Sequence, residues 1–334
     1  MSESIDRGTP GRRVTYVLPV HDEGAVIRAF HTALVTATEE RPDLDLRFVY
    51  IDDGSRDDSL DHLLEIRRDD RRVTVLGLSR NVGHQLAVTA GLDAAHAAGT
   101  DGVVVMDTDL QDPPRVSLEL VRVWEKGADV VYAQRRSRRD TVSKRLTAYL
   151  FYWLLARLAA TEIPRNVGDF RLMDARVLAE VVRYREHDRF LRGIVAHVGF
   201  RQEAVVFDRD ARYAGRSHYP LRRMIALATS GILGFSTAPL RMVSRLGLAI
   251  SALSLLGAAY VVGVRLLVPE QAVPGWAFLA VGIFLLGGLQ LTMMGVIGSY
   301  VGRIYVEAQD RPLYSLALVA GGPAGPATTS DRRP

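Results

Sequence analysis

The first 135 residues alternate short apolar runs with longer segments in which apolar residues recur every three or four positions. The apolar runs lie at residues 13–20, 46–55, 73–79, 101–109 and 128–135. The segments with helical spacing lie between them, at residues 25–40, 59–70 and 84–99. Alternating strands and helices predict an α/β domain with a mostly parallel sheet.

Polar residues stand where four of these predicted strands end. They are His21, Asp22 and Glu23, then Asp52, Asp53, Gly54 and Ser55, then Ser79, Arg80 and Asn81, and finally Asp107, Thr108 and Asp109. In an open parallel sheet, ligands bind beyond the carboxyl ends of the strands. We therefore expect these side chains to line one crevice. The chain has neither G-x-G-x-x-G nor G-x-x-x-x-G-K, so a Rossmann dinucleotide site or a P-loop is not indicated.

Two long apolar segments follow, at residues 246–267 and 276–300, and Arg265 is their one charged residue. Each reaches the length of about 20 residues that a membrane-spanning helix needs. The pattern predicts a two-helix transmembrane hairpin over residues 246–300. Buried core helices are the less favoured alternative, because core helices are seldom apolar on every face. Arg241, Arg245 and Arg303 flank the pair, which predicts that both termini are cytoplasmic.

The remaining segments complete the predicted organisation. Residues 1–13 are polar and predict a disordered arm, residues 14–215 the catalytic domain, and residues 301–334 a cytoplasmic tail. Basic amphipathic stretches at residues 143–160 and 219–236 fit helices in a membrane interface, the second within a juxtamembrane region at 216–245. Ordinary core helices remain an equal alternative for both stretches.

Composition and charge narrow the choice of partner. The chain has 334 residues, a formal net charge of +4 and no cysteine, which excludes disulfides and thiolate chemistry. Its first residues lack the apolar core of a signal peptide. One basic run contains a single acid, Asp140, among Arg135, Arg136, Arg138, Arg139, Lys144 and Arg145. Such density favours a phosphate-bearing partner. Nucleic acid is disfavoured because no aromatic residues are interleaved, and a solvated basic loop stays open.

The stretch MDTDLQDPP at residues 106–114 follows an apolar strand and carries three carboxylates. Asp107 and Asp109 supply hard oxygen ligands suited to Mg²⁺ or Mn²⁺ on a substrate phosphate, and Gln111 is a third candidate. A solvated acidic turn is the alternative. Asp112 precedes Pro113, which biases it to an extended conformation. We expect Asp112 to lie beyond the reach of the pair and to tolerate Asn.

Asp52 and Asp53 follow the apolar run FVYI. A carboxylate at that place accepts hydrogen bonds from the imide of uracil or the hydroxyls of ribose. The same residues also suit the start of a helix, where Ser55 and Asp57 favour the N-terminal end of the dipole. The two interpretations are compatible.

Seven motifs occur in an order that resembles the polyprenyl-phosphate glycosyltransferases of glycosyltransferase family 2. They are VLPVHDE, IDDGSRDDS, LSRNVGHQLAVTAGL, MDTDLQDPP, NVGDFRLMD, FLRGIVAHVGF and YAGRSHYPL. The resemblance covers residues 14–312 and is nearest to the bactoprenol glucosyltransferase branch, with dolichyl-phosphate mannose synthase more distant.

The resemblance implies a GT-A fold, a nucleotide-sugar donor and a divalent metal on Asp107 and Asp109. It places Pro19, Asp53 and Asn81 in the nucleotide pocket. It places Arg135, Lys144, Asp169, Arg171 and Arg216 near the donor and acceptor phosphates. Two positions depart from the family pattern. His21-Asp22 stands where Tyr-Asn is usual, and His218 stands where Lys is usual. At position 218 a permanent cation that contacts phosphate is thus replaced by a histidine, whose charge is expected to titrate near neutral pH.

The sequence therefore predicts inverting transfer of one sugar, glucose from UDP-glucose in the first place, to a polyprenyl phosphate at the cytoplasmic face of the plasma membrane. Asp169 is expected to orient the acceptor or act as a base, with Arg135 and Arg171 beside it. The predicted partners are the donor, the lipid phosphate and the bilayer; oligomerisation stays open. Two alternatives remain: a metal-dependent phosphatase of the haloacid dehalogenase type, and a non-catalytic nucleotide-sugar-binding membrane protein.

Overall fold

The computed structural model describes residues 11–136, 167–208, 238–267 and 275–321. The chain divides into two compact units. Unit 1 contains Met1–Ala148, Thr161–Tyr219 and Pro312–Pro334, and unit 2 contains Tyr149–Ala160 and Pro220–Arg311. The amphipathic stretches predicted at residues 143–160 and 219–236 lie outside the described residues.

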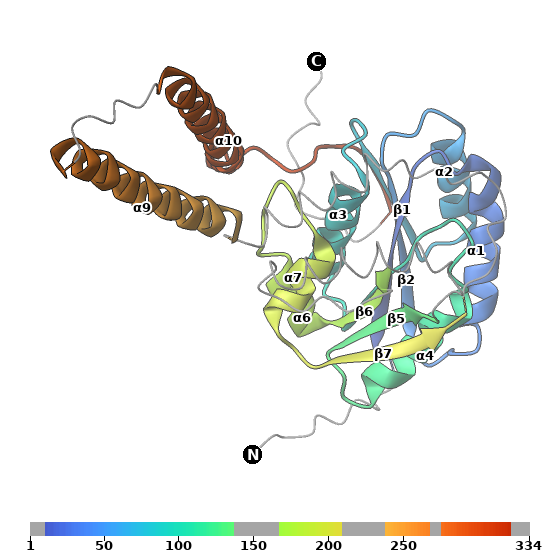
Figure 1. The fold of residues 1–334 in the computed structure, drawn as a ribbon. Helices are drawn as coiled ribbons and strands as arrows, with labels where there is room; N and C mark the ends of the chain where they lie inside the picture. The colour runs from blue at the N-terminus through green and yellow to red at the C-terminus, as the bar shows by residue number, and fades with distance from the viewer. Residues whose placement is uncertain (1–10, 137–166, 209–237, 268–274, 322–334) are drawn as a thin grey trace. The chain divides into compact units, whose positions relative to one another are not determined.

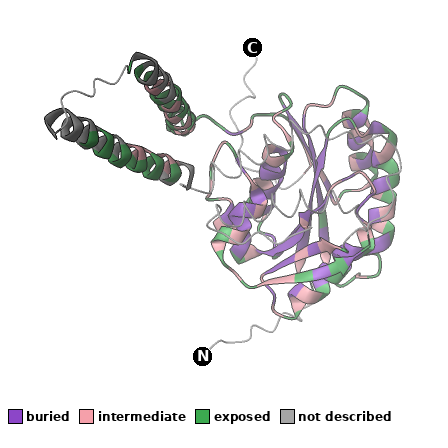
Figure 2. Ribbon diagram, viewed as in Figure 1, coloured by how far each residue is buried: buried purple, intermediate pink, exposed green. Residues whose placement is uncertain are grey.

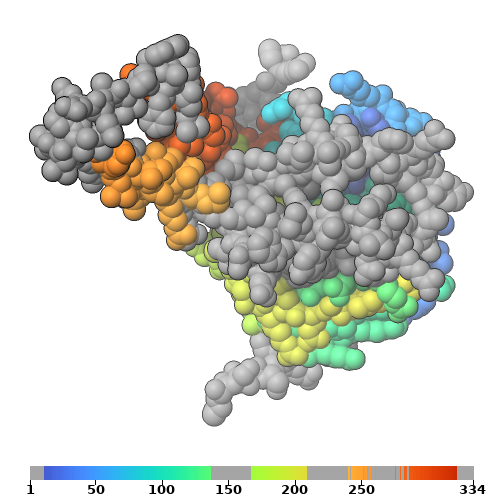
Figure 3. Space-filling view, in the orientation of Figure 1, coloured from blue at the N-terminus to red at the C-terminus, as the bar shows by residue number. Residues whose placement is uncertain are grey.

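Unit 1 is built on a mixed eight-stranded sheet with the order β7-β5-β6-β4-β1-β2-β3-β8 (Figure 1). The strands are β1 (Arg13–Val20), β2 (Asp45–Asp52), β3 (Val73–Leu78), β4 (Gly102–Val105), β5 (Val130–Arg135), β6 (Val167–Asp174), β7 (Gln202–Phe207) and β8 (Leu316–Ala320). The helices of this unit are α1 (Gly24–Thr38), α2 (Ser59–Asp69), α3 (His84–Ala97), α4 (Pro114–Glu125), α6 (Ala175–Val181) and α7 (Leu191–Val198). Strand β7 forms one edge, and Figure 3 shows it in yellow at the surface.

The five predicted strands and three predicted helices are confirmed, and β1 to β4 are parallel neighbours as expected. Strands β5 and β7 also pair in parallel, so most pairings in the sheet are parallel as expected; the sheet is mixed because β6 pairs antiparallel with β4 and β5, and β8 with β3. The result is a GT-A-like α/β fold.

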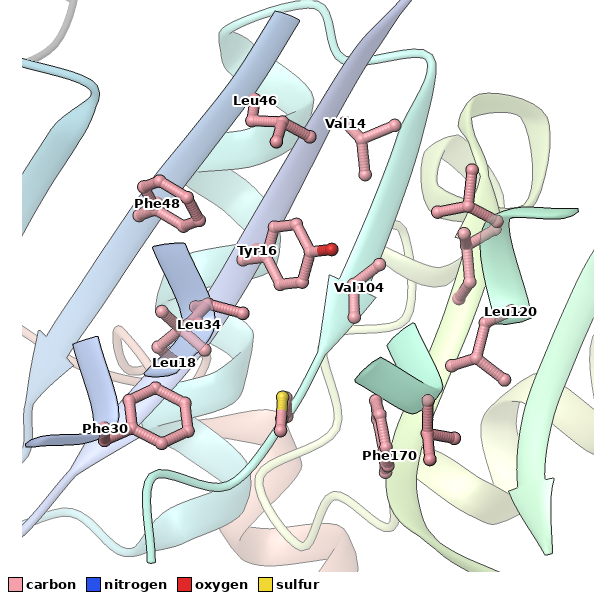
Figure 4. Close-up of a cluster of buried hydrophobic side chains, with 14 of the residues drawn as sticks. Val14, Tyr16, Leu18, Phe30, Leu34, Leu46, Phe48, Val104, Leu120 and Phe170 are labelled. Carbon is pink, nitrogen blue, oxygen red and sulfur yellow. The ribbon is translucent and has the colours of Figure 1, made fainter. Parts of the chain in front are cut away.

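The main core lies between the sheet and helices α1, α2 and α4. Tyr16 and Phe48 from the sheet meet Phe30 and Leu34 from α1, and all four side chains are fully buried (Figure 4). Helix α3 packs on the other face of β1 and β2, and α6 and α7 lie beside β6. A sheet covered on both faces explains why its strands read as nearly continuous apolar runs.

Both predicted ends of the catalytic domain need correction. Arg13, placed in the disordered arm, begins β1: its backbone N–H donates to Asp101 and its guanidinium to Asp45. Residues 316–320, placed in the tail, form β8 on the outer edge of β3. The strand pattern at residues 13–20 already included Arg13, so only the boundary of the arm was misplaced. A short strand after a helical unit carries little periodic signal, so the sequence pattern missed β8.

Unit 2 contains two long helices, α9 (Ala238–Leu267) and α10 (Trp276–Ala308). Large apolar side chains are exposed along both: Leu248 and Leu253 of α9 are 73% and 71% exposed, and Leu291 of α10 is 71% exposed. Figure 2 shows these helices largely in the colour of exposed residues. In the part of the chain that the structure describes, no helix has both the length and the apolar character needed to cross a membrane. The two-span hairpin predicted over residues 246–300, and the multi-pass topology with it, is therefore not supported.

We predict that Gly54→Ala destabilises unit 1 strongly. Gly54 has φ +63°, and a Cβ there would lie 2.6 Å from the backbone nitrogen of Asn81. Strain and a clash with backbone together should lower the free energy of unfolding by about 3 kcal/mol or more. Gly99→Ala is the matched control, because Gly99 also has positive φ (+68°) but a Cβ would meet nothing within 4 Å. The free energy of unfolding should fall by about 1 kcal/mol in the Gly99→Ala protein. Equal losses in denaturant unfolding would contradict the close approach of the two loops.

Candidate active site

The predicted acidic site lies where β4 ends beside β6. Val105 of β4 pairs with Arg171 of β6 in an antiparallel register. Extending that register by two residues sets Asp107 opposite Asp169. The Thr108 hydroxyl is buried and donates to the carbonyl of Pro19 at 3.1 Å, which fixes the acidic loop to the end of β1.

Asp109 is held by Gln111. Its two carboxylate oxygens accept the backbone N–H of Gln111 at 3.0 Å and the side-chain amide of Gln111 at 2.6 Å. Leu110 between them has φ +57°, which bends the chain sharply enough for this double contact. Gln111 thus positions Asp109 in the structure, and its predicted role as a metal ligand stays a prediction.

Asp169 is the most tightly held of the carboxylates. It is 7% exposed and accepts hydrogen bonds from Gln85 at 2.9 Å, His84 at 3.2 Å and the Arg192 Nε at 2.9 Å. Burial alone would raise its pKa, but the hydrogen bond from His84 and the charge of Arg192 outweigh it and hold the pKa well below the usual range. A carboxylate of such low basicity is a poor proton acceptor, which fits the orienting role better than the base role; both roles stay predictions.

Asp107 is less compensated. Burial, followed by the charges of Asp169, Asp112 and Asp109, raises its pKa, against a lowering contribution from His84. The His84 Nε2 lies 3.7 Å from Asp107 as well as 3.2 Å from Asp169. Burial would lower the pKa of His84, but its hydrogen bond to Asp169 and the charge of Asp107 raise it. A cation placed at Asp107 would relieve the repulsion that remains.

Asp112 is buried and faces the guanidinium group of Arg135. It is 1% exposed, and both of its oxygens lie 3.5 Å from the Arg135 Nη2. The Asp-Pro-Pro turn directs it inward because α4 starts at once with Pro114 at its first position. The tolerance of Asp112 to Asn stays a prediction from the sequence, and the burial of this side chain against Arg135 argues against it.

Arg171 is buried, with 3% of its surface exposed. One guanidinium nitrogen donates to the carbonyl of Gly168 at 2.9 Å, and burial lowers its pKa to about 10. Its Nε lacks a hydrogen-bond partner within the described residues. The charge of Arg171 helps to lower the pKa of Asp169, and its predicted place near the substrate phosphates stays a prediction. The partly exposed cations near the acids are Arg135 and Arg192.

The loops after β1, β2 and β3 meet as predicted. The Asn81 amide nitrogen lies 3.1 and 3.2 Å from the two ring nitrogens of His21. Asp53 is 3% exposed, and its oxygens accept the backbone N–H groups of Val82 and Gly83 at 2.8 and 2.9 Å. Asp53 thus fixes the β3–α3 loop, and a contact to a nucleotide is not needed to explain it.

Four further residues that the sequence assigned to this site lie at the ends of β1, β2 and β3 or in the loops that follow these strands. Burial raises the pKa of Asp52 at the end of β2. Pro19 pairs with Ile51 inside the sheet. Glu23 precedes α1, where its N–H binds Ser59, and Arg80 is exposed on the loop after β3. Lys144 and Arg216 lie outside the described residues.

Sequence reasoning missed His84, Gln85 and Arg192 as site residues. His84 and Gln85 begin α3 shortly after the polar cluster at Asn81, so extending that cluster by four residues would have found them. Arg192 comes from α7, far along the chain, and no local signal marks it. Over the described residues, no group of three or more His, Asp or Glu is arranged to hold a metal.

Residues 15–182 match the protein family described as Glycosyl transferase family 2. The chain is 41% identical over 306 residues to an uncharacterized glycosyltransferase, YkcC, of Bacillus subtilis, covering 91% of this chain and 93% of the relative. It is 38% identical to the SfII prophage-derived bactoprenol glucosyl transferase of Shigella flexneri, covering 90% of this chain and 96% of the relative. This protein belongs to glycosyltransferase family 2 and is a glycosyltransferase. That result excludes the phosphatase and the non-catalytic binding protein.

Solved structures are more distant. A glucosyl-3-phosphoglycerate synthase from Mycobacterium tuberculosis, in complex with Mn²⁺, UDP and glucosyl-3-phosphoglycerate, is 21% identical. The match has a TM-score of 0.40 and covers 66% of this chain and 78% of that chain. Similarity at this level is too low to transfer a ligand or a residue's role.

We predict that Asp112→Asn lowers stability by about 2 kcal/mol, because it removes the charge that faces Arg135 at a buried position. Transferase activity should fall with it, since Arg135 loses its orientation. Asp208→Asn is the matched control: Asp208 pairs with Arg136 at 3.1 Å, but both side chains are at least 68% exposed. The stability of the Asp208→Asn protein should change by less than about 0.5 kcal/mol. Thermal unfolding and initial rates measure both variants, and an Asp112→Asn protein indistinguishable from the Asp208→Asn protein would refute the buried pair.

Proposed function

We propose that this chain transfers one sugar, with inversion, from a UDP-sugar to a polyprenyl phosphate at the cytoplasmic face of the plasma membrane, for modification of cell-envelope glycans. The observation that carries the proposal is the convergence of Asp107, Asp109 and Asp169 beside Arg135 and Arg192 at the carboxyl edge of the sheet. Glucose is the first choice of sugar, because relatives at 36–38% identity over nearly their full length are named bactoprenol glucosyl transferases.

The donor nucleotide is proposed to lie over the ends of β1, β2 and β3. His21 and Asn81 present an imidazole and an amide there, and Asp52 lies at the same edge. An imidazole ring stacks on a base, and the amide and carboxylate offer hydrogen bonds to its edge or to the ribose. Exposed Arg80 is in the same loop, where a cation favours the diphosphate.

The residues at the end of β4 fit a divalent cation. Asp107 and Asp109 supply hard oxygen ligands, and burial, together with the neighbouring charges of Asp169, Asp112 and Asp109, raises the pKa of Asp107. Two carboxylates plus diphosphate oxygens form a usual set for Mg²⁺ or Mn²⁺, so a third protein carboxylate is not required. When bound, the cation would neutralise the departing nucleoside diphosphate.

The acceptor is proposed to lie on the β6 side of the crevice. A phosphate monoester has a second pKa of about 6, so it is mostly dianionic at neutral pH and needs little help from a base. This agrees with the low basicity of Asp169. Asp169 instead orients Arg192 and His84, while Arg135, fixed by Asp112, offers charge to the attacking phosphate. Direct displacement by that phosphate inverts the anomeric carbon.

We also propose that α9 and α10 bind the lipid bilayer. Both helices expose leucine, methionine and tyrosine side chains, and α10 also exposes isoleucine and valine. Contiguous exposed apolar surface on this scale marks a membrane or protein contact, and a lipid acceptor favours the membrane.

Asp109→Asn should abolish sugar transfer while leaving the fold intact. Asn keeps the size of the side chain but removes the charge that attracts a hard cation. Activity should also vanish in EDTA and return with Mn²⁺ or Mg²⁺. The control is Asp61→Asn, a change to an exposed acid on α2. Transfer of radiolabelled sugar from a UDP-sugar to polyprenyl phosphate measures activity, and circular dichroism monitors the fold. Full activity of the Asp109→Asn protein, or in EDTA, would show that this acid serves another purpose.

Leu253→Asp combined with Leu256→Asp should reduce binding of the full chain to phospholipid vesicles by at least about tenfold, because two charges would enter an apolar surface. Val206→Asp is the control, since Val206 is also an exposed apolar residue, at 50%, but lies on β7 of unit 1. Vesicle flotation measures the bound fraction. If all three proteins float equally, α9 does not make the membrane contact.

A further inference from the structure

The chain returns to unit 1 after α10 and ends its described part in a segment that we call the C-terminal strap, residues 312–321. Its strand, β8, pairs antiparallel with β3, with Gly77 opposite Leu318 and Leu76 opposite Val319. The backbone N–H of Ser79 donates to the carbonyl of Ser315 at 2.9 Å. The strap therefore reaches the loop that carries Arg80 and Asn81.

The sheet is shaped to receive the strap. A Cβ on Gly77 would lie 3.1 Å from the Leu318 Cβ, so glycine in β3 makes room for that leucine. Leu313 is 6% exposed. A sheet edge and a buried leucine are features of a built contact rather than of a loose tail.

Hydrogen bonds among Tyr314, Asp93 and Arg185 connect the strap to two other segments. We call these three residues the latch. The Tyr314 hydroxyl donates to Asp93 of α3 at 2.7 Å. Arg185, from the connection between α6 and α7, donates to both oxygens of Asp93 at 2.8 and 2.9 Å. Asp93 thus joins the strap, the middle of α3 and the α6–α7 connection through charge-assisted hydrogen bonds.

The same two segments carry site residues at their other ends. Helix α3 begins with His84 and Gln85, both bonded to Asp169. The α6–α7 connection leads into α7, where the Leu191 N–H donates to Gln85 Oε1 at 2.9 Å and Arg192 binds Asp169. Every donor to Asp169 described above therefore stands on a segment that the latch holds.

We propose that Tyr314 and Asp93 are positioning residues for sugar transfer: the C-terminal strap, through the latch, sets the alignment of α3 and the α6–α7 connection that presents His84, Gln85 and Arg192 to Asp169. Neither residue touches substrate in this account. The inference rests on the proposed function only for the identity of the acceptor, because the latch itself is defined within unit 1.

Two measurements on the full chain test the proposal. In amide hydrogen exchange, Tyr314→Phe should speed exchange about five- to tenfold across residues 184–192 and the first turn of α3, because one charge-assisted bond is lost. Exchange in α1 should not change. In the transfer assay, Tyr314→Phe should lower kcat about five- to tenfold with little change in KM for the donor, and Asp93→Asn should lower it further. Adding Tyr314→Phe to Asp93→Asn should have little extra effect, because both act through one contact.

Arg183→Lys is the control for an Arg185→Lys variant, since Arg183 lies two residues away, is 73% exposed and pairs only locally with Glu180 among the described residues. Arg185→Lys should retain part of the activity that Asp93→Asn loses, because a cation remains. Unchanged exchange in the Tyr314→Phe protein would overturn the latch, whatever the substrate. Faster exchange with unchanged kcat would overturn its role in positioning. A uniform rise in exchange over unit 1, with a matching fall in Tm, would mean that the strap is merely structural.

Discussion

The placement of four carboxylates at one end of the sheet is the constraint around which this site is organised. Asp107, Asp109, Asp112 and Asp169 gather where β4 and β6 run side by side. Like charges so close together are stable only if cations or hydrogen-bond donors meet each of them. Asp112 faces Arg135, Asp109 faces Gln111, and Asp169 binds three donors. Asp107 is the least compensated of the four, which is why the proposed divalent cation is assigned to it.

The compensating groups come from elements that are distant in sequence, so the fold must hold several segments in register at once. The antiparallel β6 brings Asp169 beside Asp107, and α7 brings Arg192 to Asp169. On the other side, Asp53 ties the β3–α3 loop to the end of β2, and Gly54 allows the two loops to touch. The acidic residues thus lie between the ends of β1, β2 and β3, where the nucleotide is proposed to bind, and the cations Arg135 and Arg192. This arrangement fits the proposed joining of two phosphate-bearing substrates.

The sequence predicted the parts of this arrangement that rest on local periodicity. The first four strands, the helices between them and the acidic residues at their ends follow from alternating patterns and from the rule for strand ends. The antiparallel β6 and β8 could not be predicted in the same way, because pairing partners depend on long-range contacts. The burial of individual charged residues could not be predicted either: nothing in the local sequence indicates that Asp112 and Arg171 are 1% and 3% exposed, because burial depends on the long-range contacts of β6. The membrane-spanning interpretation of residues 246–300 relied on apolar length alone.

The most direct test of the central claim is a donor-to-lipid mass balance with purified full-length chain, Mn²⁺, UDP-glucose labelled in the sugar, and polyprenyl phosphate in vesicles. The account predicts that labelled glucose becomes lipid-soluble in a one-to-one ratio with released UDP, that the product has the inverted anomeric configuration, and that omitting the lipid phosphate stops UDP release. UDP release that continues unchanged without lipid phosphate, or lipid product with the donor's anomeric configuration, would contradict it.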